Sequence, residues 1–160
     1  MLLTVVLAAG GCAGKTQAPF GATAGALVPR PAPERVALPA LVLGRFADDY
    51  GSVHTINSDE WRHDAHSKYH IVKWVGAKEY LIAYNDIANP SDGGKWTRID
   101  WLPLPGMPPY EWAFCLSAYK AATAAEAEAT TTANRALPRT GCSGFPFTRM
   151  NRVGAAPDAP

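Results

Sequence analysis

The chain has 160 residues, with 15 Lys and Arg against 14 Asp and Glu and a formal net charge of +1. This length fits one ordinary domain, and the near-even charge balance excludes the strong basic field with which proteins gather nucleic acid. The five Trp, six Tyr and five Phe fall almost wholly after residue 45. We therefore expect one compact domain in the later part of the chain and no nucleic-acid partner.

The chain begins with a short apolar run that ends in small residues and a cysteine, Ala9-Gly10-Gly11-Cys12. This ending resembles the lipobox of bacterial lipoproteins, in which the cysteine thiol receives a diacylglycerol before the signal is removed. The resemblance implies that residues 1–11 are an export signal and that Cys12 is the lipid attachment site. It also implies a protein anchored to a membrane of the bacterial cell envelope, either periplasmic or surface-exposed. The run is too short to span a bilayer as a helix.

Two features differ from the lipobox pattern. The position three before the cysteine is Ala9 rather than Leu, and no Lys or Arg precedes the apolar run, which indicates a start upstream of Met1. Residues 12–40 are rich in Ala, Gly and Pro and show no apolar period, so they are predicted to be a disordered, lipid-attached linker. A linker of this kind would hold a domain away from the membrane, which agrees with the lipoprotein hypothesis.

From residue 41 the sequence changes to short β-prone runs separated by turn residues. A single β domain is expected over 41–153, with a disordered tail at 154–160. The predicted strands are 41–46, 51–57, 67–75, 79–85, 95–102, 110–117 and 145–150. Thr123 and Glu126 have capping-box spacing, which predicts one short helix near 123–129. Six to seven short strands and one helix indicate a mostly β fold, either a small antiparallel β-barrel or a compact sandwich.

The opening of the domain, residues 44–51 (GRFADDYG) followed by a strand, resembles the first hairpin of small lipocalin-like barrels. The resemblance rests on a Gly-x-aromatic start and covers only this hairpin. It implies a barrel rather than a sandwich and carries no functional motif.

The clearest alternation in the chain lies at 110–117, where Tyr, Trp, Phe and Leu alternate with Glu, Ala, Cys and Ser. It predicts a strand with its aromatic face in the core and Cys115 pointing outward. With Cys12 assigned to lipid in an exported chain, Cys115 and Cys142 are expected to form a disulfide across the outside of the sheet. Two buried free thiols are the alternative.

His63, His66 and His70 are candidate metal ligands by their spacing alone. Spacings of three and four residues bring side chains together on a helix, but here a turn precedes a strand. Exposed loop histidines are therefore the favoured interpretation, and no metal, cofactor or catalytic residue is predicted. Asp48-Asp49 is interpreted as a solvated turn or a Ca²⁺ site rather than a catalytic dyad.

The five Trp are many for so small a domain, and Trp beside polar residues is typical of sugar or peptide recognition. Trp74 and Trp112 are expected to fill the core. On the strand at 95–102, alternation places an aromatic, a basic and an acidic side chain on one face, which predicts a polar-aromatic surface patch. The candidate binding residues are Trp61, Trp96, Arg98, Asp100 and Trp101.

These observations favour a non-enzymatic envelope lipoprotein whose β domain binds a small ligand, a glycan or a protein partner. One alternative is a structural or assembly role in the envelope. Another is a metal-dependent hydrolase that uses the His63–His70 region. An open apolar lumen would favour ligand binding, and a lumen filled by side chains would favour a partner or structural role.

Overall fold

The structure is a computed structural model that describes residues 38–64 and 66–154. The predicted export signal, the lipid attachment site Cys12 and nearly all of the predicted linker lie outside the described residues, as does all but the first residue of the predicted tail. In the described ranges, no helix is long and apolar enough to cross a membrane.

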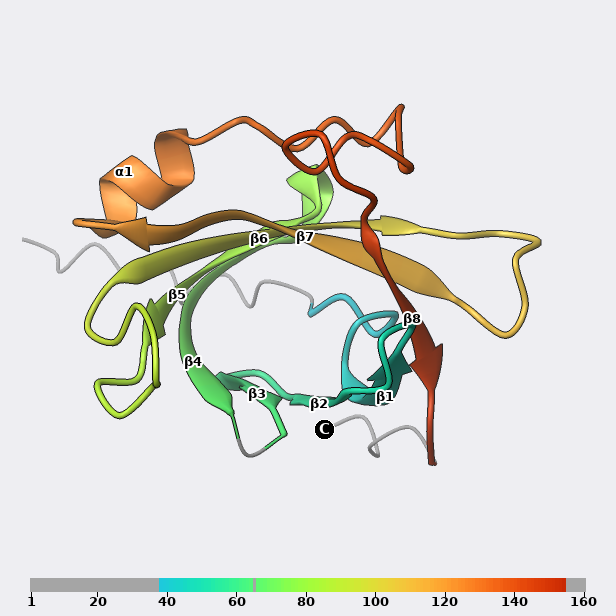
Figure 1. The fold of residues 1–160 in the computed structure, drawn as a ribbon, viewed down its shortest axis with the longest axis horizontal. Helices are drawn as coiled ribbons and strands as arrows, with labels where there is room; N and C mark the ends of the chain where they lie inside the picture. Colours follow the sequence, from blue (N-terminus) through green and yellow to red (C-terminus); the bar gives the residue numbers. More distant parts are fainter. Residues whose placement is uncertain (1–37, 65, 155–160) are drawn as a thin grey trace, which may run out of the picture. The chain divides into compact units, whose positions relative to one another are not determined.

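The described chain forms a closed antiparallel barrel in which each strand pairs with the next and the last pairs with the first. Figure 1 looks into the ring, with β6 and β7 across the top and β1 to β3 below. The strands are β1 (Gly44–Asp48), β2 (Val53–Ile56), β3 (Glu60–His63), β4 (Ser67–Val75), β5 (Tyr80–Asn85), β6 (Trp96–Pro103), β7 (Trp112–Ala121) and β8 (Thr148–Arg152). The predicted small β-barrel is confirmed.

The barrel has one strand more than the sequence predicts, because β3 lies where a turn was expected. The Asn57 side-chain oxygen accepts hydrogen bonds from the backbone N–H groups of Asp59 and Glu60, which tightens the chain into a hairpin directly after β2. β3 then pairs with both β2 and β4. A strand of four residues in which only Trp61 is fully buried is too short to give a detectable alternation.

The last strand, β8, closes the barrel over a short distance. It pairs with β1 at Phe46–Asp48 and with β7 only at Trp112–Phe114. β7 continues to Ala121 and pairs there with β6 alone. The second half of β7 therefore has no neighbouring strand on its other side.

Aromatic side chains from opposite walls fill much of the barrel interior. Trp112 and Phe114 of β7 point inward, as the alternation predicts, and meet the Trp61 ring edge-on with centroids 5.9 and 5.0 Å away. Phe46 of β1 contacts Trp112 at 5.1 Å. Complete burial of one such side chain stabilises a fold by roughly 1.5–3 kcal/mol, so this group holds together β1, β3 and β7.

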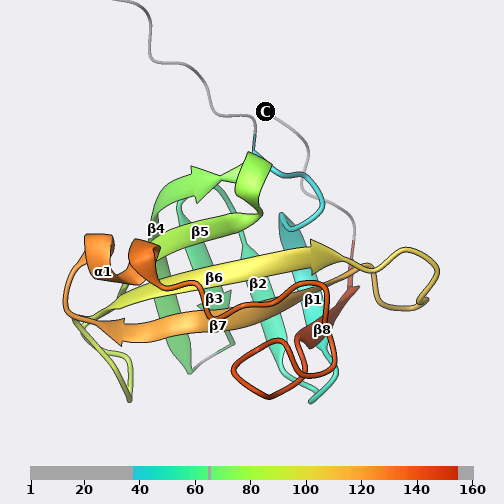
Figure 2. The ribbon, with the colours of Figure 1, turned by 90° about the horizontal axis from the view of Figure 1, so that it is seen from above.

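A short helix, α1 (Ala124–Ala129), covers part of the outer face of β5, β6 and β7 (Figure 2). Thr123 Oγ1 accepts a hydrogen bond from the Glu126 backbone N–H, so the predicted capping residue does cap the helix. Ala127 packs onto the outward-facing side chains of Tyr80 and Ile82. The helix therefore shields apolar residues of β5 that would otherwise face water.

The chain between α1 and β8, residues 130–147, is called the strap here. It runs back over the outer face of β6 and β7 (Figure 2). A disulfide between Cys115 and Cys142, whose Cα atoms lie 5.5 Å apart, fastens the strap to β7. Phe147 is buried beside this bond together with Leu102. The predicted pairing and the outward direction of Cys115 are confirmed.

Candidate functional site

A cavity of about 600 Å³ lies at the end of the barrel that carries the turn between β1 and β2. Tyr69 of β4, Ile99 of β6 and Phe114 of β7 supply apolar wall from inside the barrel. Leu116 and Tyr119 come from the half of β7 that lacks a β8 partner. The cavity therefore lies beside the part of the barrel wall that has no strand ladder.

The entrance of this cavity is aromatic. Tyr50 in the β1–β2 turn, Tyr119 on β7 and Phe145 in the strap are 74%, 46% and 72% exposed. Among the described residues these are the exposed Phe, Tyr and Trp side chains, and all three line this one cavity. Because grouped exposed apolar side chains mark binding surfaces, we name these three residues the aromatic rim.

A hydrogen-bonded chain of three side chains forms the buried wall of the cavity. His54 Nε2 lies 3.0 Å from Asp48 Oδ2, and Trp61 Nε1 donates to His54 Nδ1 at 3.0 Å. An indole N–H is only a donor, so His54 Nδ1 is an unprotonated acceptor. The neutral His54 ring therefore carries its proton on Nε2 and donates it to Asp48.

Asp48 is ionised in this arrangement. Its Oδ1 accepts hydrogen bonds from the backbone N–H groups of Tyr50 and Ser52 at 2.9 and 2.8 Å. Burial alone would raise the pKa of the Asp48 carboxyl, but the hydrogen bonds from His54 and these two N–H groups outweigh burial and lower its pKa below the ordinary value.

His54 is neutral. Burial lowers the pKa of its imidazole, and the hydrogen bond with Asp48 raises that pKa only in part, so the pKa lies below the ordinary His value. The neutral state is also the one that the Trp61 hydrogen bond requires. Asp48 and His54 are thus a charged acceptor and a neutral donor with a fixed tautomer.

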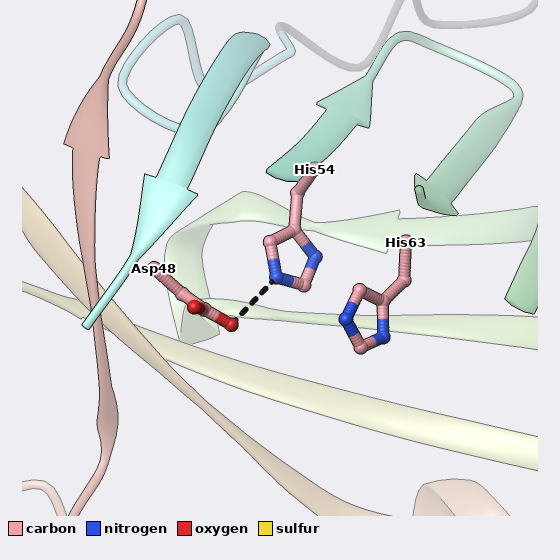
Figure 3. A group of neighbouring side chains, drawn as sticks. All are labelled: Asp48, His54 and His63. Atoms are coloured by element: carbon pink, nitrogen blue, oxygen red, sulfur yellow. Dashed lines mark hydrogen bonds and ion pairs between the residues drawn. The ribbon is translucent and has the colours of Figure 1, made fainter. Parts of the chain in front are cut away.

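His63 carries a buried polar atom that lacks a hydrogen-bond partner among the described residues. It lies opposite His54 in the β2–β3 register, and the two rings stack with centroids 4.4 Å apart and planes 13° apart. Figure 3 shows both rings on the same side of the sheet as Asp48. His63 Nε2 is buried and makes no hydrogen bond with any described residue; Trp112 Nε1, in the core, is the other such side-chain atom. An unpaired buried polar atom costs about 1–3 kcal/mol.

One ligand atom each from Asp48, His54 and His63 lie within 4.8 Å of one another, close enough to hold a metal ion. A metal on His54 Nε2 would displace the proton to Nδ1, where it would face the Trp61 N–H. Two donors would then oppose each other, and a buried hydrogen bond would be lost. This hydrogen-bond arrangement therefore does not fit a three-ligand metal site.

The three histidines that sequence spacing offers as metal ligands do not form one ligand group. His63 ends β3, rather than lying in a turn, and lines the cavity. The exposed His66 follows in the turn, with its ring centroid 5.8 Å from that of His63. His70 on β4 bonds the Asp86 carboxylate at 2.8 Å, outside the barrel. Only His63 belongs to the candidate site.

The predicted polar-aromatic patch is not at the surface, because its members are buried or half-buried. Trp61 and Trp101 are 1% and 3% exposed and belong to the core, although Trp61 also lines the cavity. Trp96 packs against a tyrosine of β5. Arg98 and Asp100 do share the outward face of β6, but α1 and the strap cover that face.

Asp100 is the centre of a second buried polar cluster, on the outer face. It is 1% exposed and accepts hydrogen bonds from Arg98 Nε and Nη2 at 2.8 and 2.9 Å. Arg135 of the strap donates at 2.6 Å, and the Ser117 hydroxyl donates as well. The Arg98 guanidinium also lies 3.9 Å over the Tyr80 ring. Both carboxylate oxygens are therefore paired. The bond from Arg135 makes this outer cluster a connection between the strap and the barrel.

Sequence reasoning missed His54, although a signal exists. His54 and Ile56 lie on the same face of β2, and both are buried. A polar side chain in register with apolar ones predicts a buried hydrogen bond. Its partners, Asp48 and Trp61, come from two other strands, so the pairing becomes visible only once the sheet has curled into a barrel.

Comparisons of the chain with known protein families, with curated proteins and with solved structures found no match. The lipobox and lipocalin-like resemblances gain no support there and stay predictions. A function must therefore be argued from the geometry and chemistry of the site.

Proposed function

We propose that this protein is a non-enzymatic, lipid-anchored envelope protein whose barrel binds a small ligand between the aromatic rim and His63. The observation that carries the proposal is the unpaired His63 Nε2, buried at the wall of a cavity of about 600 Å³. Ligand pockets commonly have volumes of about 300–1,000 Å³ and combine apolar walls with a few polar groups. This cavity has both properties.

The positions of the histidines favour binding over the metal-dependent hydrolase alternative. That alternative needs ligands from the His63–His70 region around one metal ion, but His70 bonds the Asp86 carboxylate outside the barrel. The hydrogen bonds of His54 to Trp61 and Asp48 also do not fit a metal ion held by Asp48, His54 and His63. The cavity beside the aromatic core in turn favours a ligand over a purely structural role, because a structural barrel gains stability from complete packing.

The binding proposal can be tested with N-phenyl-1-naphthylamine, a neutral probe that fluoresces in apolar surroundings. We expect saturable binding to the wild type and loss of at least tenfold in affinity for Leu116→Trp, which fills the lumen. Val72→Trp is the matched control, because Val72 lies on β4 and is 55% exposed. Equal binding by the wild type and both variants, with circular dichroism showing both folded, would overturn the proposal.

The anchor is tested separately by Cys12→Ser. We expect the wild type in the membrane fraction and the variant in the soluble periplasmic or culture fraction, since a single lipidated cysteine is the proposed anchor. A variant that still fractionates with membranes would contradict lipid attachment at Cys12 and leave the ligand-binding proposal standing.

A further inference from the structure

Among the described residues that line the cavity, Asp48 is the only Asp, Glu, Lys or Arg, so its carboxylate is the one charge that these residue types contribute. The remaining polar groups of its wall are hydroxyls of Ser, Thr and Tyr and the imidazoles of His54 and His63. The hydrogen bond from Trp61 keeps His54 neutral. The wall therefore creates a negative potential and has no Lys or Arg to balance an anion.

Aromatic rings make up much of the rest of the wall, namely Tyr50, Trp61, Tyr69, Phe114, Tyr119 and Phe145. The face of an aromatic ring attracts cations. The barrel uses this attraction elsewhere, since the Arg149 guanidinium lies 4.5 Å over the Tyr110 ring. Of the cavity rings, only Tyr119 has such a partner among the described residues, Lys120 with its Nζ at 5.4 Å.

We propose that the ligand is an organic cation, a primary or secondary ammonium compound with an apolar body. The proposal includes the tautomer of His63, which carries its proton on Nδ1 and leaves Nε2 as an acceptor. The ammonium group of the ligand donates hydrogen bonds to His63 Nε2 and to Asp48, and its body lies among the aromatic rings. This inference rests on the proposed function and names the class of ligand. An ammonium group supplies both a donor for His63 and a positive charge for Asp48. An alcohol supplies only the donor, and a carboxylate supplies neither.

The geometry accommodates such a group. One ligand atom of Asp48 and one of His63 lie within 4.8 Å of each other, so a single nitrogen can lie about 3 Å from both. A carboxylate offers about four acceptor positions. Three of those of Asp48 are used by His54, Tyr50 and Ser52, which leaves one for the ligand.

The test uses three probes with the same body: 2-naphthylmethylammonium, 2-naphthalenemethanol and 2-naphthoate. Isothermal titration at pH 7.5 measures the affinity of each probe for the soluble Cys12→Ser protein. We expect the cation to bind at least tenfold more tightly than the alcohol, and the anion to bind most weakly. Replacing Lys120 by Gln should strengthen the binding of the cation by about twofold to threefold, because a like charge is removed from the rim.

Asp48→Asn should lower the affinity for the cation at least tenfold and leave that for the alcohol within about twofold. Asp49→Asn is the matched control, because Asp49 is the next residue of the chain but pairs with Arg149 outside this cavity. If Asp48→Asn fails to fold, Tyr119→Ser with Phe145→Ser replaces it. These exposed rim substitutions should weaken the cation more than the alcohol, and Leu137→Ser, 55% exposed in the strap, should change neither.

The two proposals fail in different ways. If no probe binds, or if Leu116→Trp leaves the affinity for all probes unchanged, the lumen is not a ligand site and the proposed function falls with the inference. If the probes bind and Leu116→Trp excludes them, but the alcohol or the anion binds as tightly as the cation, only the cation inference is overturned.

Discussion

Asp100 on the outer face of the barrel and Asp48 on the inner face are both buried carboxylates, but their surroundings differ. Asp100 is paired with two guanidinium groups and a hydroxyl, and it does not line the cavity described above. Asp48 is held by one neutral imidazole and two backbone N–H groups. Beside it lie a hollow and the unpaired Nε2 of His63.

The difference separates a polar cluster that holds the fold from one that is open to a ligand. Buried polar groups in proteins are nearly always hydrogen-bonded, so an exception calls for an explanation. The outer cluster has no such exception at its carboxylate, and it connects the strap to β6. In the inner cluster, the unpaired His63 Nε2 lowers stability and leaves one hydrogen-bonding position open. Substitutions in the outer cluster should therefore lower stability more than binding, and substitutions at the open position of the inner cluster should lower binding more than stability.

The largest loss of stability is expected for Asp100→Asn. It leaves Arg98 and Arg135 buried or half-buried without their shared counter-charge, and removal of one partner from a buried ion pair costs about 3–5 kcal/mol. Urea unfolding measures the change. Asp59→Asn, at an exposed turn, is the control and should stay within about 0.5 kcal/mol. Similar values for the two variants would show that the outer cluster does not hold the strap.

Removal of the disulfide by Cys115→Ala with Cys142→Ala should cost about 3–4 kcal/mol, because a closed loop in the unfolded chain is released. The two cysteines are 27 positions apart. Thermal melting of the oxidised and reduced wild type provides the same comparison without a substitution. A reduced protein that melts at the temperature of the oxidised one would contradict the role of the bond in fastening the strap.

The inner cluster should make stability depend on pH through His54. Its folded pKa lies below its ordinary value of 6.5, so the unfolded chain binds more protons below that pH. The free energy of unfolding should therefore fall as the pH drops below about 6.5, by up to about 1.4 kcal/mol per pH unit. Asp48, whose pKa is also lowered, adds a further loss below its ordinary 3.8.

His54→Gln tests this dependence, because the Gln amide keeps a donor for Asp48 and does not titrate. Urea unfolding at several values between pH 5 and pH 8 should give a shallower slope for the variant than for the wild type. His70→Gln is the control, since His70 lies outside the barrel and is not buried. Equal slopes for the wild type and His54→Gln would show that His54 is not held neutral by its surroundings.

The smallest loss of stability is expected for His63→Phe. Phe keeps the ring stacked on His54 and removes the buried Nε2 that has no partner, so the free energy of unfolding should not fall and should rise by up to about 1–3 kcal/mol. Cation binding should nevertheless fall at least tenfold, which calorimetry measures. A loss of several kcal/mol would mean that His63 belongs with the structural cluster.

Sequence patterns predicted most of the strands but not the path that joins them. The alternation at 110–117 identified the inward face of β7 and the direction of Cys115, because each inward side chain there is large and apolar. β3 was missed because its residues other than Trp61, namely Glu60, Arg62 and His63, are polar, as residues of a turn are. The closure of β8 onto β1 is a long-range pairing that leaves no local signal.

The candidate site was only partly predictable. His63 was noticed for its spacing to other histidines, yet its partner in the structure is His54 of the adjacent strand, through the β2–β3 register. Arg98 and Asp100 were placed on one face correctly, but α1 and the strap bury that face. Local periodicity reports which way a side chain points, and only tertiary structure reports what covers it.

The short pairing of β8 also bears on the order of folding. β1 and β8 join Phe46 to Arg152, and folds dominated by such distant pairings form in milliseconds to seconds, more slowly than those built from local contacts. Until β8 docks, β1 and β7 both present unpaired edges. The hairpins from β1 to β7 are each local, so we expect closure by β8 to come last. The lumen, with its ligand site, would then take shape only in that final step.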